Sequence, residues 1–291
     1  MIIVKLNGGL GNQMFQYAAG RRLAYVLGAK LKFDISCFSQ NVLRNYALGV
    51  FNIQECFAKP HEVSQLTIQR QGAIEKIISK MSGVPPKTLS SWIKEEYFHF
   101  NPNVLNLSDD VYLDGYWQSE KYFKDVAETI RRDFTIKIPQ AGRNKELAAL
   151  IKSCESVSLH IRRGDYISNP HTKQYHGICD LSYYYLCIEQ VGKKVERPHF
   201  ILFSDDPEWV RENLKVQYPM VLVDHNTTEY AYEDLRLISQ CKHHIIANST
   251  FSWWGAWLNS DTDKMVFAPR RWFGTKEQND ADLIPENWMR I

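Results

Sequence analysis

The sequence has few features of a secreted, membrane-spanning or nucleic-acid-binding protein. Its six cysteines form no Cys-x-x-Cys pair, so a zinc site and a disulfide framework are not expected and a reducing compartment is favoured. No run approaches the roughly 18 apolar residues of a membrane helix, and no secretory leader pattern precedes the first strand. The 35 basic and 33 acidic residues nearly balance, so no dedicated nucleic-acid surface is expected. We expect a soluble protein of the cytoplasm or of the inner face of the membrane.

The first half of the chain begins with the pattern of one βαβ unit. An apolar strand over residues 2–6 leads through a glycine-rich loop into a helix from about Gln13 to Leu27, with apolar residues at helical spacing. Gly28 stands where a glycine commonly ends a helix, and alternating residues predict a second strand over 31–35. The remaining expectations for this half are a helix over 62–81, an aromatic-rich irregular stretch over 92–117 and a helix over 120–132.

After about residue 153, short apolar runs and amphipathic runs alternate regularly. The alternation indicates a parallel sheet covered by helices on both faces. We therefore expect an α/β protein with two Rossmann-like domains facing each other across a cleft, residues 1–153 and residues 154–291. The strands are predicted at 156–161, 199–203, 220–223, 243–247 and 265–268, and the helices at 181–191, 207–215, 229–241 and 252–259.

A cluster of cationic and donor side chains follows the strand over 156–161, in the segment His160-Ile161-Arg162-Arg163-Gly164-Asp165-Tyr166. The planar arginine fork binds phosphate oxygens bidentately, and ligands of open α/β sheets sit beyond the carboxyl ends of strands. Strand alternation directs His160 and Arg162 the same way, toward a ligand, and leaves Arg163 to pair with Asp165 or a helix carboxylate. The competing interpretation is a surface strand end with two solvated arginines.

Two other strand ends carry polar residues. The segment Asn248-Ser249-Thr250-Phe251-Ser252 enters a helix and could form an anion-binding nest, although plain helix capping needs only one of these side chains. Asp205 and Asp206 follow the strand over 199–203, where they could cap the next helix or accept hydrogen bonds from a purine ring. Both interpretations stay open from the sequence.

The loop over residues 8–13 follows a strand and opens a helix, which favours contact with a phosphate. It departs from the dinucleotide fingerprint, because Met14 stands where the third glycine belongs, although Asp34 lies about 20 residues on. A tight turn that needs glycines for positive φ is the structural alternative. That alternative leaves the amides of Asn12 and Gln13 unexplained, and these can bind a sugar or a phosphate.

Two Asp-x-Asp patterns, Asp261-Thr262-Asp263 and Asp280-Ala281-Asp282, resemble metal sites of sugar transferases, but neither follows a convincing apolar strand. We therefore expect no metal and no cofactor. Three strand-end motifs in the second half would line one sheet edge, and the glycine loop would face them. Arginine, hydroxyl and amide donors without a metal cage describe a site for a sugar nucleotide whose diphosphate leaves.

Three long motifs together resemble glycosyltransferase family 11, the α-1,2-fucosyltransferases. They are the segment from Gly8 to Ala18, the segment from His160 to Tyr166 and the segment from Asn248 to Trp254, and they occur in the family's order over nearly the whole chain. The segment from Tyr112 to Ser119 is similar to a further family segment. The resemblance implies a GT-B fold and inverting, metal-independent transfer of L-fucose from GDP-β-L-fucose to the 2-hydroxyl of a terminal β-galactoside, free or lipid-linked. Bacterial members, which act in O-antigen or capsule biosynthesis, are the nearest in organisation.

The resemblance also implies roles for particular residues. His160 and Arg162 would meet the diphosphate, and Asp205 or Asp206 the guanine. Asn248, Ser249, Thr250 and Ser252 would bind the phosphates and fucose, while Gly11 and Asn12 would close over the fucose. The distribution of the motifs and the aromatic-rich segment over 92–117 separately suggest that the N-terminal domain binds the acceptor, with Trp117 and Gln118 as its contacts.

The sequence does not single out the group that takes the acceptor's proton. Asp34, Glu95, Glu96 and Asp114 are candidates for this general base, and we favour Asp114 because it ends an apolar, strand-like run. Asp165 is expected to pair with the arginines, and a reaction without a dedicated base also stays open. A non-catalytic nucleotide-sugar binding protein and a NAD-dependent oxidoreductase remain the alternative functions.

Overall fold

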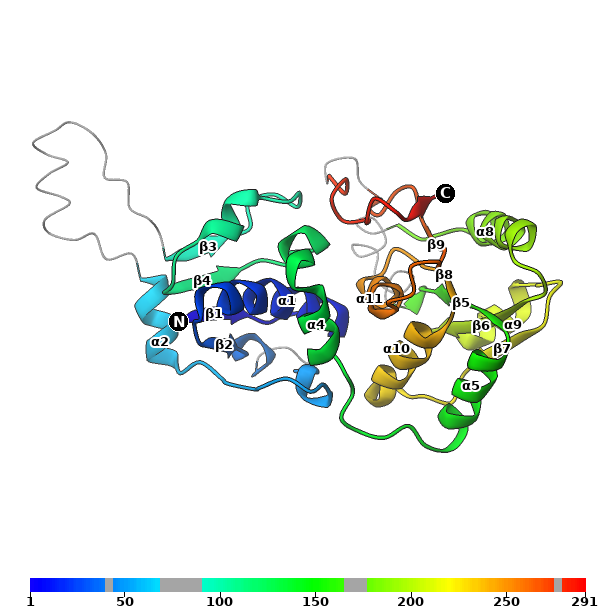
Figure 1. Cartoon of the computed structure of the whole chain (residues 1–291), viewed down its shortest axis with the longest axis horizontal. Helices are drawn as coiled ribbons and strands as arrows, with labels where there is room; N and C mark the ends of the chain where they lie inside the picture. The colour runs from blue at the N-terminus through cyan, green and yellow to red at the C-terminus, as the bar shows by residue number, and fades with distance from the viewer. Residues whose placement is uncertain (40–43, 69–90, 165–176, 275–278) are drawn as a thin grey trace, which may run out of the picture. The chain divides into compact units, whose positions relative to one another are not determined.

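The computed structural model describes residues 1–39, 44–68, 91–164, 177–274 and 279–291, and divides into two compact units (Figure 1). The first unit comprises Met1–Gly49 and Ile53–Ile130, and the second comprises Val50–Asn52 and Arg131–Ile291. The boundary therefore lies well before residue 153, where the sequence had placed it. The reason is helix α5 (Gly142–Ser153), which was not predicted and which buries Leu147 and Ile151 in the core of the second unit.

The first unit contains a four-stranded parallel sheet in the order β2-β1-β4-β3. Strand β1 (Ile2–Lys5), helix α1 (Leu10–Leu27) and strand β2 (Leu31–Asp34) form the predicted βαβ unit, and Gly28 ends α1 with a φ of 60°. Strands β3 (Trp92–Lys94) and β4 (Val111–Asp114) correct the expectation of an irregular stretch over 92–117. β4 coincides with the apolar run that ends at Asp114, whereas the three residues of β3 lie among polar and aromatic residues that show no alternation.

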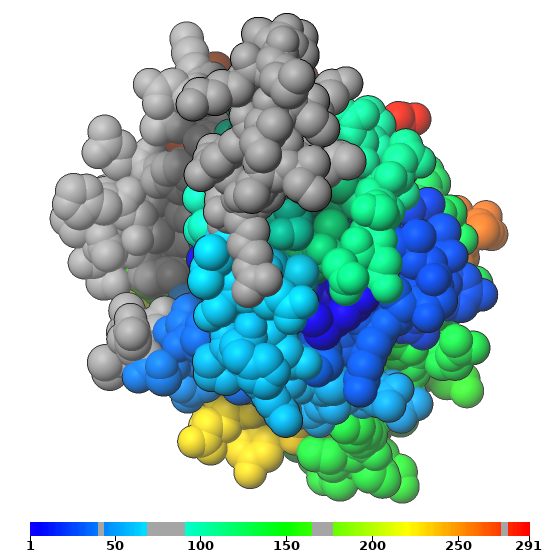
Figure 2. Space-filling view, turned by 90° about the vertical axis from the view of Figure 1, so that its left-hand side faces the viewer, coloured from blue at the N-terminus to red at the C-terminus, as the bar shows by residue number. Residues whose placement is uncertain are grey.

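Two helices cover opposite faces of this sheet. Helix α1 packs so closely on β1 that a Cβ added at Gly20 would overlap the Val4 side chain. Helix α2 (Pro60–Thr67) packs Leu66 against Ile3 and Tyr112 on the other face, and Figure 2 shows it in cyan on the surface of this unit. Val4 and Ile3 are neighbours in the strand, so their side chains point to opposite faces. The expected helix over 62–81 thus begins at Pro60, and its part beyond residue 68 lies outside the described residues.

Short 3-10 turns connect the remaining elements of the first unit. The expected helix over 120–132 is two such turns followed by α4 (Ala127–Asp133). The 3-10 elements are η1 (Ser36–Ser39), η2 (Leu48–Val50), η3 (Pro102–Asn106), η4 (Glu120–Tyr122) and η5 (Lys124–Val126). Among the described residues, no helix combines the length and the hydropathy needed to cross a bilayer.

The second unit is built on a six-stranded parallel sheet in the order β10-β9-β8-β5-β6-β7. The predicted strands are present within a few residues, and the two-residue β10 was not predicted. The strands are β5 (Glu155–Ile161), β6 (Pro198–Ser204), β7 (Met220–Val223), β8 (His243–Ile245), β9 (Val266–Ala268) and β10 (Met289–Arg290).

Helices cover both faces of this second sheet, as the alternating pattern predicts. Helices α8 (Leu181–Lys194) and α9 (Pro207–Asn213) pack on the face that carries Val157, Leu159 and Ile161. Helices α5 and α10 (Ala231–Gln240) pack on the opposite face, against Ile201 and Phe203. The turn η6 (Thr228–Tyr230) precedes α10, and α11 (Thr250–Leu258) packs against it.

Each sheet has one point where the strand order reverses. In the second sheet the chain proceeds from β5 to β6 and β7 on one side and to β8 and β9 on the other. In the first sheet the reversal lies between β1 and β4. Ligands of open α/β sheets bind beyond the carboxyl ends of the strands at such points, which directs attention to the residues after β5 and β8 and after β1 and β4.

Candidate active site

The three strand-end motifs of the second half lie together at one edge of the second sheet, as predicted. Strand β5 pairs with β6 in a register that aligns Ile161 with Ser204, so the residues that follow are neighbours. The Arg163 backbone N–H donates to Asp205 Oδ1 at 2.8 Å. The His160 ring lies 5.7 Å from the Phe251 ring at the start of α11, which joins the segment after β8 to the same edge.

Asp205 holds Arg162 in place. Its Oδ2 forms an ion pair with Arg162 Nη1 at 2.9 Å, while its Oδ1 accepts the Arg163 backbone N–H. A Cβ added at Gly164 would lie 2.5 Å from Asp205 Oδ2, so only glycine lets the loop approach this carboxylate so closely. The carboxylate therefore fixes the guanidinium at the carboxyl end of β5, beside the reversal of strand order.

Arg163 points to different partners, as strand alternation predicts. Its Nε lies 3.2 Å from Asp206 Oδ2, and its guanidinium carbon lies 3.6 Å from the centre of the Trp209 ring. Asp206 also accepts the Trp209 backbone N–H and thereby caps α9. A helix carboxylate is thus the partner of Arg163, whereas Asp165 lies outside the described residues. The sequence had not indicated Trp209 as a platform for this arginine.

His160 is a buried, neutral donor or acceptor at this edge. The residue is 5% exposed, and its Nδ1 has no hydrogen-bond partner among the described residues. Burial lowers the pKa of His160 to about 4, with Arg162 acting in the same direction and Asp205 opposing both. A buried polar atom without a partner is uncommon and calls for an explanation, and a ligand oxygen would supply one.

The side chains of Asn248 and Ser252 form hydrogen bonds within the protein. The Asn248 amide donates to the Gly177 and Trp272 carbonyls and accepts from the Cys179 thiol, so it ties two loops together. Ser252 Oγ donates to the Ser249 carbonyl. These two side chains therefore serve the structure of the loops, while Ser249 and Thr250 stand at the start of α11, where backbone N–H groups generally favour an anion.

The glycine loop of the first unit is bound to the loop after β4. Gly8 has a φ of 75°, and a Cβ there would lie 2.7 Å from the Asn12 amide nitrogen, so the tight-turn interpretation is confirmed at this position. Asn12 Oδ1 accepts Gln118 Nε2 at 3.0 Å, and Gln16 Nε2 donates to the Gly115 carbonyl at 3.2 Å. These bonds hold the segments over 8–16 and 115–118 as one assembly.

The Gln13 amide, which the sequence left available to a sugar, is occupied within the protein. Its Nε2 donates to the carbonyls of Gly8 and Asn45, and its Oε1 accepts the Ala47 N–H. Gln13 therefore shapes the glycine loop. Met14 is fully buried in the core of the first unit.

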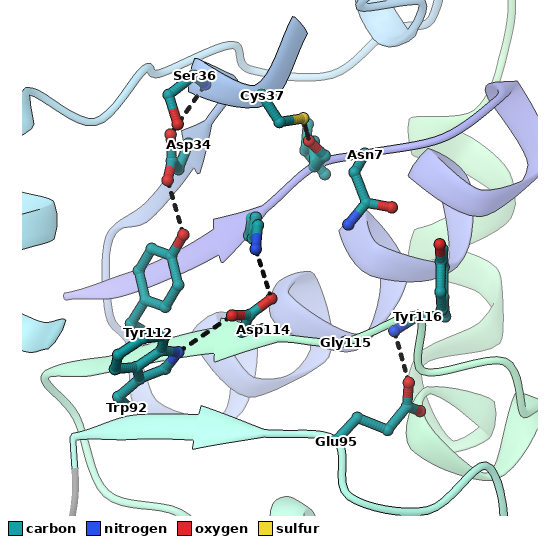
Figure 3. A network of polar contacts seen from close by, with 12 residues as sticks. Asn7, Asp34, Ser36, Cys37, Trp92, Glu95, Tyr112, Asp114, Gly115 and Tyr116 are labelled. Carbon is teal, nitrogen blue, oxygen red and sulfur yellow. Dashed lines mark hydrogen bonds and ion pairs between the residues drawn. The ribbon is translucent and has the colours of Figure 1, made fainter. Parts of the chain in front are cut away.

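The candidate carboxylates of the first unit lie along the carboxyl edge of its sheet and differ in their partners (Figure 3). Asp114 pairs with Lys5 at 3.0 Å and accepts Trp92 Nε1 at 3.2 Å. Asp34 accepts the Tyr112 hydroxyl at 2.6 Å and the Ser36 N–H at 2.9 Å. Glu95 accepts two backbone N–H groups from the loop after β4.

The aromatic residues of this segment divide into buried and exposed ones. Trp117 is 1% exposed, has a φ of 56° and packs its ring on Tyr122, so the indole belongs to the core. Tyr97 and Tyr116 are 67% and 41% exposed, and the Tyr97 ring stacks on His99. The exposed rings near Glu95 are therefore tyrosines, and contact between Trp117 and an acceptor stays a prediction.

The two Asp-x-Asp patterns have structural partners. Asp261 Oδ1 accepts the Asp263 N–H in the turn after α11. Asp280 accepts the Trp272 N–H and pairs with Arg290. Both aspartates thus stabilise turns near the C-terminal end of the chain.

Comparisons with known proteins agree with this arrangement. The model of Glycosyl transferase family 11 matches residues 1–291. Alpha-1,2-colitosyltransferase of Escherichia coli is 35% identical over 297 residues, which cover 100% of this chain and 99% of that protein. Galactoside alpha-(1,2)-fucosyltransferase 1 of Mus musculus is 28% identical over 259 residues, which cover 86% of this chain and 61% of that protein.

A solved structure of Arabidopsis thaliana FUT1 in complex with GDP supports the fold. It is 11% identical and has a TM-score of 0.50, covering 98% of this chain and 74% of that chain. Two Rossmann-like α/β units of the GT-B class, as expected, carry the motifs described above. The chain therefore belongs to glycosyltransferase family 11.

Proposed function

We propose that this glycosyltransferase moves L-fucose from GDP-β-L-fucose to the 2-hydroxyl of a terminal β-galactoside, with inversion and without a metal ion. The observation that carries the proposal is the arginine at the carboxyl end of β5, fixed by Asp205 beside the unpartnered nitrogen of His160. A fixed guanidinium next to a neutral imidazole suits a diphosphate that gains charge as its bond to the sugar breaks.

The second unit then binds the donor. Arg162 stabilises the charge on the departing β-phosphate, and neutral His160 donates a hydrogen bond to a phosphate or sugar oxygen. The backbone N–H groups at the start of α11, in the segment over 248–252, add further donors. Asp205 and Asp206 already have protein partners, so their proposed contacts with guanine use the lone pairs that remain.

The first unit contributes the remaining contacts of the proposal. Gly11 and Asn12 lie in the loop that closes over the fucose, and Trp117 and Gln118 lie in the segment assigned to the acceptor. The bond between Gln118 and Asn12 joins these two segments, so binding of the acceptor would also order the glycine loop.

A second candidate donor is GDP-colitose, because the relative that is 35% identical is a colitosyltransferase. Colitose differs from fucose by the loss of the 3-hydroxyl group. Sites that hydrogen-bond a sugar hydroxyl reject the deoxy analogue strongly, while apolar pockets discriminate weakly. The ratio of kcat/KM for the two donors therefore decides the assignment.

The test incubates the protein separately with each donor and with a panel of β-galactosides, and measures GDP release and the linkage of the product by NMR. Transfer from GDP-fucose with an α-1,2 linkage supports the proposal, and Arg162→Ala serves as the inactive control. Binding of GDP without transfer to any acceptor would favour the non-catalytic binding protein. Release of GDP only with the colitose donor would move the assignment to the second candidate.

A further inference from the structure

We propose that Glu95 is the catalytic base that takes the proton from the acceptor hydroxyl. The inference rests on the proposed function and assigns a step that the donor-binding residues leave open. It replaces Asp114, which the sequence favoured, with the residue that follows the neighbouring strand β3. Four observations support it. Asp114 and Asp34 are engaged by other groups, the loop after β4 holds Glu95 in one orientation, the hydrogen-bond partners of Glu95 are neutral, and exposed tyrosine rings lie near it.

Asp114 and Asp34 already meet stronger partners, while Glu96 is exposed. One Asp114 oxygen is 3.0 Å from the Lys5 ammonium, and the other accepts the Trp92 indole N–H. Asp34 is buried and receives the Tyr112 hydroxyl and a backbone N–H. A hydroxyl approaching Asp114 would compete with a lysine, and one approaching Asp34 would have to enter the core.

Glu95 is held in one orientation by the loop after β4. Its Oε2 accepts the Tyr116 N–H at 2.6 Å and its Oε1 accepts the Trp117 N–H at 2.9 Å. A Cβ added at Gly115 would overlap the Glu95 side chain and lie 3.0 Å from Oε2, so the loop admits this carboxylate only because residue 115 is glycine. Figure 3 shows Glu95 beyond the end of β3, apart from Asp114.

The partners of Glu95 are neutral, and each oxygen keeps a lone pair. Within the described part of the chain no cation pairs with Glu95, since Lys5 meets Asp114 and Lys94 lies over the Trp92 ring at 3.8 Å. The titratable groups nearby are the Tyr116 hydroxyl and, beyond it, Lys5 and Cys37. Burial raises the pKa of Glu95 to about 7, against the opposing effect of the two N–H bonds. A base of that strength is well matched to neutral pH.

The surroundings of Glu95 suit a sugar. The side chain is half-buried. Two tyrosines with exposed rings are close to it: Tyr97 follows it by two residues in the sequence, and Tyr116 donates its backbone N–H to the carboxylate. Aromatic rings with one wet edge pack on the apolar faces of sugars while their hydroxyl groups stay hydrogen-bonded. A carboxylate bound to the loop after β4, with exposed tyrosines nearby, is thus placed to meet an acceptor hydroxyl.

The step balances as follows. The acceptor oxygen forms a bond to the anomeric carbon while its O–H bond breaks and the proton passes to Glu95. The bond between the anomeric carbon and the β-phosphate oxygen breaks, and its electron pair leaves with GDP. Glu95 then returns the proton to water.

The test compares the full-length wild type with Glu95→Gln, Glu95→Asp and Glu95→Ala, with Asp114→Asn as the matched control. For Glu95→Gln we expect a loss of about 10²–10⁴-fold in kcat with unchanged GDP affinity, as for removal of a general base. The wild-type kcat/KM should fall as the pH drops below about 7, because a protonated base cannot accept a proton. Glu95→Asp and Asp114→Asn should keep this dependence, and formate should restore part of the turnover of Glu95→Ala.

A role confined to holding the loop would give a different result. Near-normal kcat in a folded Glu95→Gln, or a loss in Glu95→Ala that formate does not restore, would overturn the assignment. If only Asp114→Asn abolished the fall of kcat/KM at low pH, Asp114 would be the base instead. The wild-type measurements separate this outcome from a failure of the proposed function. A wild type that transfers fucose to no β-galactoside refutes that function. An active wild type together with an active Glu95→Gln refutes only the assignment of Glu95 as the base.

Discussion

Adjacent arginines with opposite roles give the sharpest prediction of this structure. Arg162 meets Asp205 at the edge of the sheet, whereas Arg163 stacks on Trp209 and pairs with the helix cap Asp206. Substituting each arginine by lysine keeps the charge and removes the planar fork. The two conservative variants should therefore fail in different assays, although the residues are neighbours in sequence and identical in type.

The magnitudes follow from the partners. Removing a charge-assisted donor to a leaving phosphate costs about 3–4 kcal/mol in the transition state, so Arg162→Ala should lose roughly 10²–10³ in kcat. Arg162→Lys should also be badly impaired, since an ammonium cannot bind both Asp205 and phosphate oxygens in the geometry of the fork. Arg163→Lys loses the planar stacking of the guanidinium on Trp209 and so weakens a cation–π contact that is worth about 0.5–2 kcal/mol, and it should lower the Tm by a few degrees.

The assay measures kcat and GDP affinity for each variant, together with a thermal melt. We expect Arg162→Lys to melt near the wild type with little turnover, and Arg163→Lys to melt earlier with turnover largely retained. Near-normal turnover in a folded Arg162→Ala would remove the central residue of the mechanism. An Arg163→Lys variant that loses as much turnover as Arg162→Lys would refute the division between them.

Three further predictions concern the metal, the acceptor segment and the loop after β5. Release of GDP in the presence of a β-galactoside should persist in excess EDTA; activity lost on chelation and restored by manganese or magnesium would promote Asp261 and Asp263. Trp117→Ala should lose about 3–5 kcal/mol of stability, as expected for a buried indole, and its folded fraction should show a raised acceptor KM. Calorimetry should find its GDP affinity unchanged, and a weakened affinity would contradict the binding of GDP by the second unit. Gly164→Ala should lower kcat more than the Tm, because the new methyl group meets the Asp205 carboxylate; unchanged kinetics would show that the ion pair has room to move.

The regular part of the fold was predictable because its apolar runs alternate with amphipathic helical runs. β5 and β6 each have seven residues, and their ends were placed within a residue or two. Strand β3 escaped because its three residues lie in an aromatic-rich stretch without that alternation, and α5 because its buried face rests on only Leu147 and Ile151.

The site was predictable where residues act through the strand that carries them. Alternation along β5 separated Arg162 from Arg163 correctly. The residues that hold these two arginines in place could not be predicted from the sequence, because they depend on which strands are neighbours. Asp205 reaches Arg162 only because β5 pairs with β6. Similarly, the Gln13 amide was left available to a ligand because its carbonyl partner at Asn45 lies far along the chain.

The two units use one local arrangement twice, with different chemical results. In the second unit, a carboxylate that follows a strand, Asp205, accepts an N–H from the loop of the adjacent strand, and Gly164 in that loop makes room for it. In the first unit Glu95 accepts two N–H groups from the adjacent loop, and Gly115 makes room in the same way.

What distinguishes the two carboxylates is the cation. Asp205 meets a guanidinium, so its charge holds Arg162 in place. Glu95 has only neutral N–H donors among the described residues, so its charge remains available to a proton. In the reaction that we propose, the carboxylate with an arginine beside it therefore serves the departure of the phosphate, and the carboxylate without one serves the removal of the proton.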